Sequence, residues 1–300
     1  GHANDLASTL LMATDTPVLI APAMNVRMWL HPANQRNVAT LETDGINRIG
    51  PDEGDMACGE FGPGRLAEPQ AILDAIITRL GAGPLSGKHI LVTSGPTHEP
   101  IDPVRYIANR SSGAQGSAIA SALVRLGAHV TFVTGPADAP HPQGATIVPV
   151  QTADQMLNAV NAALPVDAAV FAAAVADWRV ESATESKIKK AITGKPPALK
   201  LTENPDILAT ISKKRKDRPG LVIGFAAETD DVIANATAKR KRKKCDWIVA
   251  NDVSPETGIM GGSENAVTVI DENGSETWPR ATKTDVARRL ADRIASALAE

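Results

Sequence analysis

The sequence predicts an α/β protein whose larger part is a doubly wound, mostly parallel, Rossmann-like sheet. Three observations support this fold class. Apolar runs alternate with helical patterns from about residue 85 onward, alanine is abundant, and aromatic residues make up only 3% of the 300 residues. Small aliphatic side chains suit helices that pack closely on both faces of a sheet, whereas an all-β sandwich is disfavoured.

A Gly-, Pro- and Ser-rich stretch at residues 80–88 divides the chain into two predicted domains, 1–82 and 83–300. In the first we expect a helix capped by Asn4 or Asp5, a buried strand, a glycine-rich segment and a second helix. These four elements are expected over residues 4–14, 17–25, 54–69 and 69–80, respectively.

The second domain alternates strands with helices. Strands are predicted over residues 89–95, 129–135, 146–150, 168–175, 220–228 and 246–252. Helices are predicted over residues 114–127, 152–164, 204–214 and 231–244 and from residue 284, with a hairpin over 264–278. The nearly apolar run at 168–175 is typical of a central parallel strand, and such sheets bind ligands at the carboxyl ends of their strands.

Composition excludes several classes of protein. The net charge is −3 and the pI is about 6.1, so the chain as a whole has no electrostatic attraction for nucleic acid or membranes. Two cysteines make no disulfide framework, no apolar run approaches the ~18 residues of a membrane helix, and no signal peptide is present. We therefore expect a cytoplasmic protein. Because the chain starts without Met, as if inside a domain, we also expect a fragment of a longer chain.

Five predicted strands end in small or polar residues, which indicates a ligand site at one edge of the sheet. The five ends are "SG" at 94–95, "TG" at 134–135, "AAVADWR" at 173–179, "GFAAET" at 224–229 and "AND" at 250–252. At any single strand, glycine and alanine are explained by tight packing of strand against helix. Five ends in register favour a site.

The loop "EPIDPVRYIANRSSGAQG" at 99–116 joins the first of these strands to a helix. Gly113 and Gly116 would let backbone N–H groups face an anion, Arg105 adds charge, and the amide of Asn109 can donate to an oxyanion. An ordinary capped helix explains the glycines equally well. The absence of GxGxxG, and Gly135 where a dinucleotide fold needs an acid, argue against NAD.

Two lysine-rich segments have alternative interpretations. Residues 186–195 suit a loop that closes over phosphates, although charge alone favours a solvated run. Lys239 and Lys243 are four residues apart and share one face of a helix that could reach a triphosphate. A nucleic-acid patch is the alternative, which the acidic chain and the lack of interleaved aromatic residues weaken. Scattered histidines predict no metal site, and Cys58, a lone cysteine in a glycine-rich stretch, is more often inert than an acid.

These motifs together resemble a known family. From about Leu85, "EPIDPVRYIANRSSG", "AAVADWR", "KIKK", "NPDI", "GFAAET" and "AKRKRKK" resemble phosphopantothenate–cysteine ligase. Before it, "PAMN" and "ACGEFGPGR" resemble the end of phosphopantothenoylcysteine decarboxylase, a flavoprotein that is fused to the ligase in bacterial bifunctional proteins of coenzyme A biosynthesis. The resemblance implies CTP-dependent ligation of 4′-phosphopantothenate to L-cysteine through an acyl-cytidylate. The full-length protein would then decarboxylate the product to 4′-phosphopantetheine with FMN.

The resemblance also implies roles for particular residues. Asn109 would stabilise the acyl-cytidylate, with Arg105 close by, and Lys187 would act from a mobile loop. The nucleotide would be bound by Ala173, Ala174, Asp177, Glu203, Asn204, Pro205, Asp206, Phe225, Lys239 and Lys243. Asn25 would hold the substrate carboxylate of the decarboxylase and Cys58 would donate its proton. CTP would be used with Mg²⁺, whose ligands are left open.

The same resemblance sets expectations about completeness and assembly. We expect the ligase domain to be complete and to follow a C-terminal fragment of a flavodoxin-like decarboxylase domain, truncated at its N-terminus. That fragment should have no decarboxylase activity by itself, because no stretch matches the family's catalytic His. A homodimer through the ligase domain is expected, and a higher homo-oligomer for a full-length chain. Pro96 and His98 replace the glycine and arginine frequent in relatives, which weakens any phosphate role there.

Two other hypotheses stay open beside the ligase: a non-catalytic dinucleotide-binding or regulatory module, and a nucleic-acid-binding protein that uses residues 239–244. The missing GxGxxG argues against the first and the net charge against the second.

Overall fold

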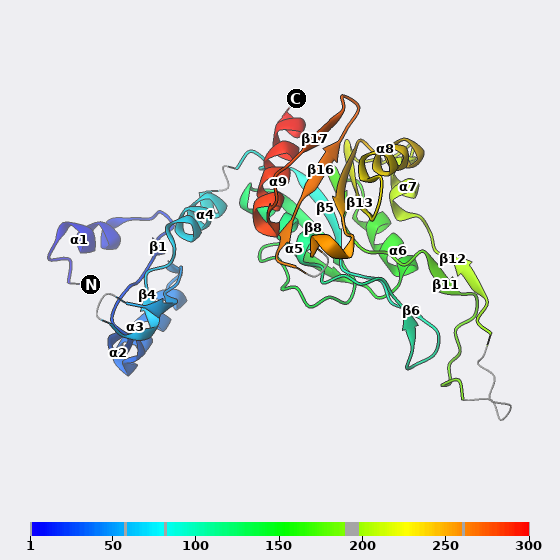
Figure 1. The fold of residues 1–300 in the computed structure, drawn as a ribbon. Coiled ribbons are helices and arrows are strands. Elements are labelled where there is room, and N and C mark those ends of the chain that lie inside the picture. The colour runs from blue at the N-terminus through cyan, green and yellow to red at the C-terminus, as the bar shows by residue number, and fades with distance from the viewer. Residues whose placement is uncertain (1, 57–58, 81–82, 190–197, 260–261, 300) are drawn as a thin grey trace. The chain divides into compact units, whose positions relative to one another are not determined.

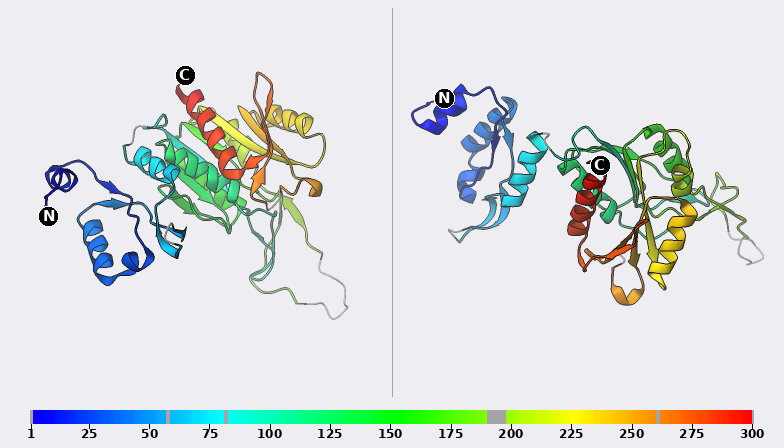
Figure 2. Two further views of the ribbon diagram at one scale, coloured as in Figure 1. Left: turned by 60° about the vertical axis from the view of Figure 1, so that its left-hand side comes forward. Right: turned by 90° about the horizontal axis from the view of Figure 1, so that it is seen from above.

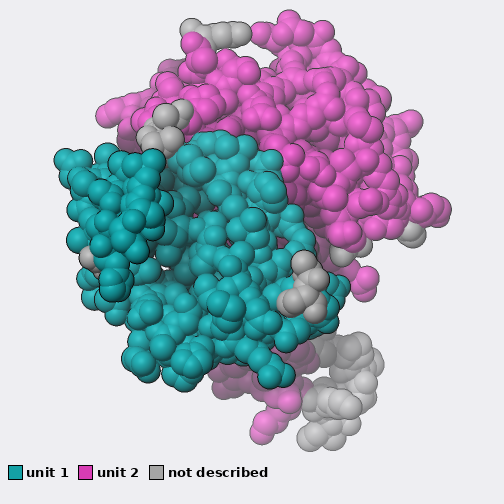
Figure 3. Space-filling view, turned by 90° about the vertical axis from the view of Figure 1, so that its left-hand side faces the viewer, with its two compact units in different colours: residues 1–81 teal, residues 82–300 magenta. Residues whose placement is uncertain are grey.

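The computed structural model describes residues 2–56, 59–80, 83–189, 198–259 and 262–299. The chain forms two compact units, Gly1–Gly81 and Ala82–Glu300, which Figure 3 colours separately. No helix of the described residues is long and apolar enough to cross a membrane.

Unit 1 is built from short elements. They are α1 (Leu6–Ala13), β1 (Leu19–Ile20), α2 (Val26–Leu30), α3 (Pro32–Thr43), β2 (Asn47–Arg48), β3 (Asp52–Asp55), β4 (Phe61–Arg65) and α4 (Pro69–Leu80). Asp5 caps α1 by accepting from the backbone N–H of Ser8. Strand β1 pairs with β2 in parallel, and β3 and β4 form an antiparallel hairpin. The predicted strand at 17–25 is therefore only two residues long, and the glycine-rich segment forms a hairpin.

Unit 2 contains an eight-stranded sheet in the order β17-β16-β14-β13-β10-β5-β8-β9. Its parallel strands are β5 (His89–Ser94), β8 (His129–Thr134), β9 (Thr146–Pro149), β10 (Ala168–Phe171), β13 (Leu221–Glu228) and β14 (Trp247–Asp252). Strands β16 (Val267–Ile270) and β17 (Ser275–Thr277) extend it in antiparallel orientation. The parallel part has the doubly wound order, and the direction of winding reverses between β5 and β10.

Helices cover both faces of this sheet (Figures 1 and 2). Helices α5 (Ala114–Arg125) and α9 (Lys283–Ala299) bury one core with alternate side chains of the strands. Helices α6 (Ala153–Ala163), α7 (Ile207–Ser212) and α8 (Val232–Lys243) bury a second core on the opposite face. In β5, Ile90 and Val92 point into the first core and Leu91 into the second. Because both faces of the strand are buried, successive residues are apolar.

In the part of unit 2 that the structure describes, three small antiparallel pairs lie outside the main sheet. They are β6 (Glu99–Pro100) with β7 (Tyr106–Ile107), β11 (Trp178–Val180) with β12 (Leu201–Glu203), and β15 (Glu264–Asn265) with β18 (Ala281–Thr282). A 3₁₀ turn covers Pro255–Thr257. The first two pairs extend beyond the sheet together as an arm (Figure 1). The sequence pattern predicted none of these pairs.

Glycines explain how closely α5 approaches β5. Gly113 precedes α5 with a φ of 72°, in the left-handed region that favours glycine. A Cβ on Gly116 would lie 2.3 Å from Oγ of Ser94, so only glycine allows the helix to pack there. Packing therefore accounts for Gly116.

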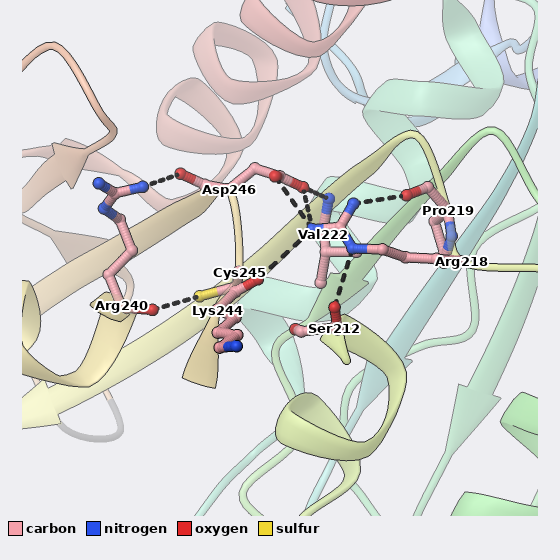
Figure 4. Close-up of polar contacts among 8 residues, drawn as sticks. All are labelled: Ser212, Arg218, Pro219, Val222, Arg240, Lys244, Cys245 and Asp246. Carbon is pink, nitrogen blue, oxygen red and sulfur yellow. Dashed lines mark hydrogen bonds and ion pairs between the residues drawn. The ribbon is translucent and has the colours of Figure 1, made fainter. Parts of the chain in front are cut away.

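The edge of the sheet where β13 and β14 begin is fastened by Arg218 and Asp246 (Figure 4). The guanidinium donates to both carboxylate oxygens of Asp246 at 3.0 Å and to the backbone oxygens of Ser212 and Pro219 at 2.9 Å. Asp246 also accepts from the backbone N–H of Val222 at 2.7 Å. This cluster joins the end of α7 to two strands.

We expect the Arg218→Met substitution to lower the free energy of unfolding by about 2 kcal/mol and to leave kcat unchanged. The loss would leave the carboxylate of Asp246 without its main partner, although partial exposure reduces the cost. Urea denaturation followed by tryptophan fluorescence measures it. The matched control is Lys200→Met, which removes an exposed ion pair with Glu181 and should change stability by less than about 0.5 kcal/mol.

Candidate active site

A cavity of about 890 Å³ opens at the carboxyl ends of β5, β10, β13 and β14. Thr93, Phe171 and Phe225 line it from the strands, and residues 109–113 line it together with the first turn of α5. Its place is the point where the winding of the sheet reverses, which is where doubly wound sheets bind ligands.

Most residues predicted for the nucleotide and the acyl group line this one cavity. They are Asn109, Ala173, Ala174, Asp177, Glu203, Asn204, Pro205, Asp206, Phe225, Lys239 and Lys243. The structure thus brings together residues that are up to 134 positions apart in the chain, from 109 to 243. Arg105 and Lys187 do not belong to the lining. The chemical roles of all these residues stay predictions.

The segment after β10 forms one wall, and its backbone is held by β5 and the following loop. The backbone N–H of Ala174 donates to the oxygen of Gly95 at 2.9 Å, and that of Ala176 to Oγ1 of Thr97 at 3.0 Å. The amide of Asn109 donates to the backbone oxygen of Val175 at 2.9 Å. This bond places Asn109 directly against the wall, with the rest of its amide available to a ligand.

Asp177 stands at the end of this wall with an exposed carboxylate. Asn204 fixes the backbone on either side of it, because its backbone N–H donates to the oxygen of Asp177 at 2.9 Å and its side chain to the oxygen of Ala176 at 2.7 Å. Arg179 in turn donates to Oδ1 of Asn204 at 2.9 Å. The result is a rigid edge of hydrogen-bond acceptors.

Two lysines enter the cavity from α8. Nζ of Lys239 donates to the backbone oxygen of Phe225 at 3.0 Å, and Lys243 forms an ion pair with Asp206. Asp206 also caps α7 through the backbone N–H of Ala209 at 2.9 Å. Burial acts to raise the pKa of Asp206, but its hydrogen bonds outweigh burial and leave the pKa lowered, so the carboxylate stays charged.

Burial lowers the pKa of Lys239 below the ordinary value of a lysine. A nucleotide phosphate beside this amine would raise its pKa again, so the complex would bind more protons than the free protein. We expect the affinity for CTP to fall as pH rises through the lowered pKa of the free protein. Titration of CTP binding from pH 8 upward measures this, and Lys239→Arg, which stays charged, should weaken the dependence. An identical pH profile in the wild type and in Lys239→Arg would contradict the binding of a nucleotide phosphate by Lys239.

Arg105 lies in the arm rather than in the cavity, so the structure does not show its expected closeness to the reacting group. Its guanidinium binds Asp102, with Nε at 3.0 Å from Oδ2, and donates to the backbone oxygen of Ile188 at 2.9 Å. Asp102 accepts from the backbone N–H of Ile188 at 3.0 Å. The hydrogen bond from Arg105 holds the pKa of Asp102 well below its usual range. Together the pair fastens the segment that carries Lys187 to the arm.

Several cavity residues were missed by the sequence reasoning. Gln115, Asn251, Asn265 and Lys283 line the cavity together with the predicted residues. Only Asn251 carried a signal, as a polar residue at the end of a predicted strand. Asp102 was also missed, although its spacing of three from Arg105 within "DPVR" suits an ion pair.

In unit 1 the two motifs of the first domain are neighbours. The backbone N–H of Met24 donates to the oxygen of Gly64 at 2.9 Å, and a Cβ on Gly64 would lie 2.2 Å from the oxygen of Met24. The side chain of Asn25 caps α2 and also donates to the carboxylate of Glu60. Cys58 lies outside the described residues.

Metal and thiol chemistry have no further candidate in the described ranges. Within them, no group of three or more His, Cys, Asp or Glu side chains could hold a metal ion. Cys245 is 3% exposed, and burial raises its pKa to about 11, so it is a protonated core residue.

Two family models match the chain. The flavoprotein family matches residues 1–81, and the C-terminal domain family of DNA/pantothenate metabolism flavoproteins matches residues 85–298. The coenzyme A biosynthesis bifunctional protein CoaBC of Vibrio vulnificus (strain YJ016) is 42% identical over 295 residues, covering 98% of this chain and 73% of the relative. The protein of the same name from Escherichia coli (strain K12) is 42% identical over 297 residues, with the same two coverages.

A solved structure extends the comparison. The crystal structure of the C-terminal domain of a coenzyme A biosynthesis bifunctional protein CoaBC is 39% identical, with a TM-score of 0.61. The alignment covers 72% of this chain and 98% of that domain. It includes the unit that carries the cavity.

These matches correct the view of the first domain. The α/β class with a mostly parallel sheet agrees, but the description of residues 1–82 as only a C-terminal fragment of a flavodoxin-like domain is corrected, because the flavoprotein family model matches residues 1–81. A flavoprotein-family region comes first and the second family follows. The expectation of an incomplete, inactive decarboxylase half is likewise not supported. That expectation depended on the starting residue and on the lack of a stretch that matches the family's catalytic His, whereas the flavoprotein family model matches residues 1–81.

The cavity, the order of the motifs and the matches to both units agree with one another. The chain belongs to the family of DNA/pantothenate metabolism flavoproteins that includes the coenzyme A biosynthesis bifunctional proteins CoaBC.

Proposed function

We propose that the chain ligates 4′-phosphopantothenate to L-cysteine with CTP, giving 4′-phosphopantothenoylcysteine, CMP and pyrophosphate. The observation that carries the proposal is the single cavity that Asn109, Asp177 and the two lysines of α8 line together. The names of the relatives, which place them in coenzyme A biosynthesis as bifunctional proteins, support it.

In the first step, an oxygen of the substrate carboxylate attacks the α-phosphorus of CTP. A P–O bond forms, the bond to the β-phosphate breaks, and pyrophosphate leaves. Because both partners are anions, Lys239 and Lys243 lower the repulsion by neutralising the phosphates. Mg²⁺, bound mainly by the phosphates themselves and by water, would supply further charge neutralisation. Carboxylates of Asp177 and Asp206 lie in the same cavity.

In the second step, the amine of cysteine attacks the acyl carbon. A C–N bond forms, the C–O bond to the nucleotide breaks, and CMP leaves with that oxygen while the amine loses a proton. Negative charge develops on the carbonyl oxygen, and the amide of Asn109 can donate to it. The segment of Lys187, fastened through Ile188 to the arm, would close over the intermediate and exclude water.

Recognition of cytosine needs an acceptor for its exocyclic amine. We assign this to Asp177, whose backbone Asn204 holds in place, and to the backbone oxygens of Ala173 and Ala174, which line the same cavity. Phe225 would pack on the nucleotide from β13, and residues 203–206 would contact it at the start of α7.

For unit 1 we propose FMN-dependent decarboxylation of the ligase product to 4′-phosphopantetheine. The chemistry supplied by bound FMN would be reversible hydride transfer. The chain's own contribution would be recognition of the substrate carboxylate by Asn25. That side chain already binds a carboxylate, Glu60, so its chemistry suits the role. The resemblance assigns the proton donor to Cys58.

We also propose a homodimer through unit 2. Large apolar side chains of the arm are exposed, which is typical of a surface that a partner covers. They are Val104, Tyr106, Trp178, Leu199 and Leu201, with exposed fractions of 42–60%. Sedimentation of the purified chain tests this, and a monomer at high concentration would contradict it.

The ligation is tested by pyrophosphate release. Purified protein is mixed with CTP, Mg²⁺ and 4′-phosphopantothenate before cysteine is added, and about one equivalent of pyrophosphate per active site is expected. No release, with binding of NAD or RNA instead, would refute the ligase. Mixtures without 4′-phosphopantothenate serve as the control for simple CTP hydrolysis.

A further inference from the structure

The proposed ligation brings several anionic groups into one cavity. The helical lysines that we assign to these anions both lie on the same face of the sheet. Lys239 and Lys243 belong to α8, which packs with α6 and α7. The opposite face is covered by α5 and α9. A phosphoryl group bound on the α5–α9 side would need a cation from that side.

Lys283 is such a cation. It is the first residue of α9 and lines the cavity. Both of its backbone groups are held: its N–H donates to the oxygen of Ser263 at 3.0 Å, and its oxygen accepts from Nε2 of Gln115 at 3.2 Å. The base of the side chain is therefore fixed beside the start of α5.

A chain of side-chain amides continues from this point. Oε1 of Gln115 accepts from Asn265 at 3.0 Å, and Oδ1 of Asn265 accepts from Asn251 at 3.3 Å. Asn265 is only 3% exposed, and all three amides line the cavity. They form an uncharged wall that orients polar groups without adding negative charge.

The carboxylates of the cavity lie elsewhere. Asp177, Glu203 and Asp206 belong to the segments around β11, β12 and α7. Among the described residues, no carboxylate forms an ion pair with Lys283, and burial alone lowers the pKa of its amine. The start of a helix is also an unfavourable place for a cation. No counter-charge among the described residues pairs with this amine, which is the pattern of a residue that binds an anionic ligand.

We propose that Lys283, positioned by the amides of Gln115, Asn265 and Asn251, binds a phosphoryl group of a ligation substrate on the α5–α9 side of the cavity. The inference rests on the proposed function for the identity of the substrates. Two groups share the required chemistry: the triphosphate of CTP and the 4′-phosphate of phosphopantothenate. A lysine binds either as a point charge.

The test measures binding of four ligands to the full chain: CTP, CMP, 4′-phosphopantothenate and pantothenate. If Lys283 binds the triphosphate, Lys283→Met should lower the affinity for CTP about 10- to 100-fold and leave the affinity for CMP nearly unchanged. If it serves the 4′-phosphate, the same loss falls on phosphopantothenate and spares pantothenate. Lys283→Arg should keep most of the affinity, and Lys283→Gln provides a second neutral variant.

The matched control is Arg288→Met, which removes an exposed cation that pairs with Asp285 on the same helix. Its four affinities should stay within about twofold of the wild type. The proposal is overturned if the neutral Lys283 variants bind all four ligands within about twofold of the wild type, or weaken phosphorylated and unphosphorylated ligands equally.

These measurements do not depend on turnover, so the two proposals can fail separately. If the wild type releases no pyrophosphate but Lys283→Met selectively loses affinity for phosphorylated ligands, the proposed ligation is refuted and the proposed subsite is supported. An active wild type with unaltered affinities in the variant removes only the subsite. Lys283→Met removes a partly buried charge that has no counter-charge. The midpoint of thermal unfolding of this variant should therefore equal or exceed that of the wild type.

Discussion

A Lys239→Met variant is expected to lose about 100-fold in kcat/KM for CTP while its fold stays at least as stable as the wild type. The amine lines the cavity and donates to the backbone oxygen of Phe225, so it reaches the nucleotide from a fixed position. Burial disfavours its charge, as the lowered pKa shows. Methionine fills similar volume without that cost, and activity and stability should therefore change in opposite directions.

The control for this variant lies on the same helix. Lys241 is exposed on α8 and does not line the cavity. Lys241→Met should keep kcat/KM within about threefold of the wild type. If both substitutions reduce activity equally, the effect belongs to the overall charge of α8 and the role assigned to Lys239 is wrong.

An Asn109→Asp variant is expected to lose about 10²–10³ in kcat. The substitution replaces the amide that donates to the backbone oxygen of Val175 with a carboxylate, which cannot donate. It also places a negative charge where the acyl carbonyl gains negative charge during attack by cysteine. Steady-state rates with saturating CTP, phosphopantothenate and cysteine measure the loss.

The comparison variant is Asn158→Asp, an equally conservative change at an exposed position of α6. It should leave kcat unchanged. An Asn109→Asp protein whose kcat stayed within about threefold of the wild type would exclude Asn109 from stabilising the intermediate, without affecting the fold.

The parallel strands of the main sheet could be predicted from the sequence because they are apolar-rich runs, most of which lie between helical patterns. The small pairs could not. Strand β11 pairs with β12 across a gap of about twenty residues, and each contributes only three residues, too few for any periodicity to be recognised. The same holds for β6 with β7.

Within the site, residues at strand ends and at helix starts were the easiest to predict. Asp177 and Phe225 follow from their positions after β10 and on β13, because parallel strands present their carboxyl ends together. Lys283 and Asn265 reach the cavity only through the antiparallel strands and α9, whose return to this edge is a property of the tertiary fold. Arg105 stands in a family motif, but its partner Asp102 directs it to the segment of Ile188.

The central claim is that the substrate carboxylate attacks the α-phosphorus of CTP in this cavity. It is tested most directly with 4′-phosphopantothenate labelled with ¹⁸O in the carboxylate, followed by mass spectrometry of the products. After ligation to cysteine, one labelled oxygen is expected in the phosphate of CMP, since the C–O bond breaks in the second step. Label in inorganic phosphate or pyrophosphate, with none in CMP, would contradict it.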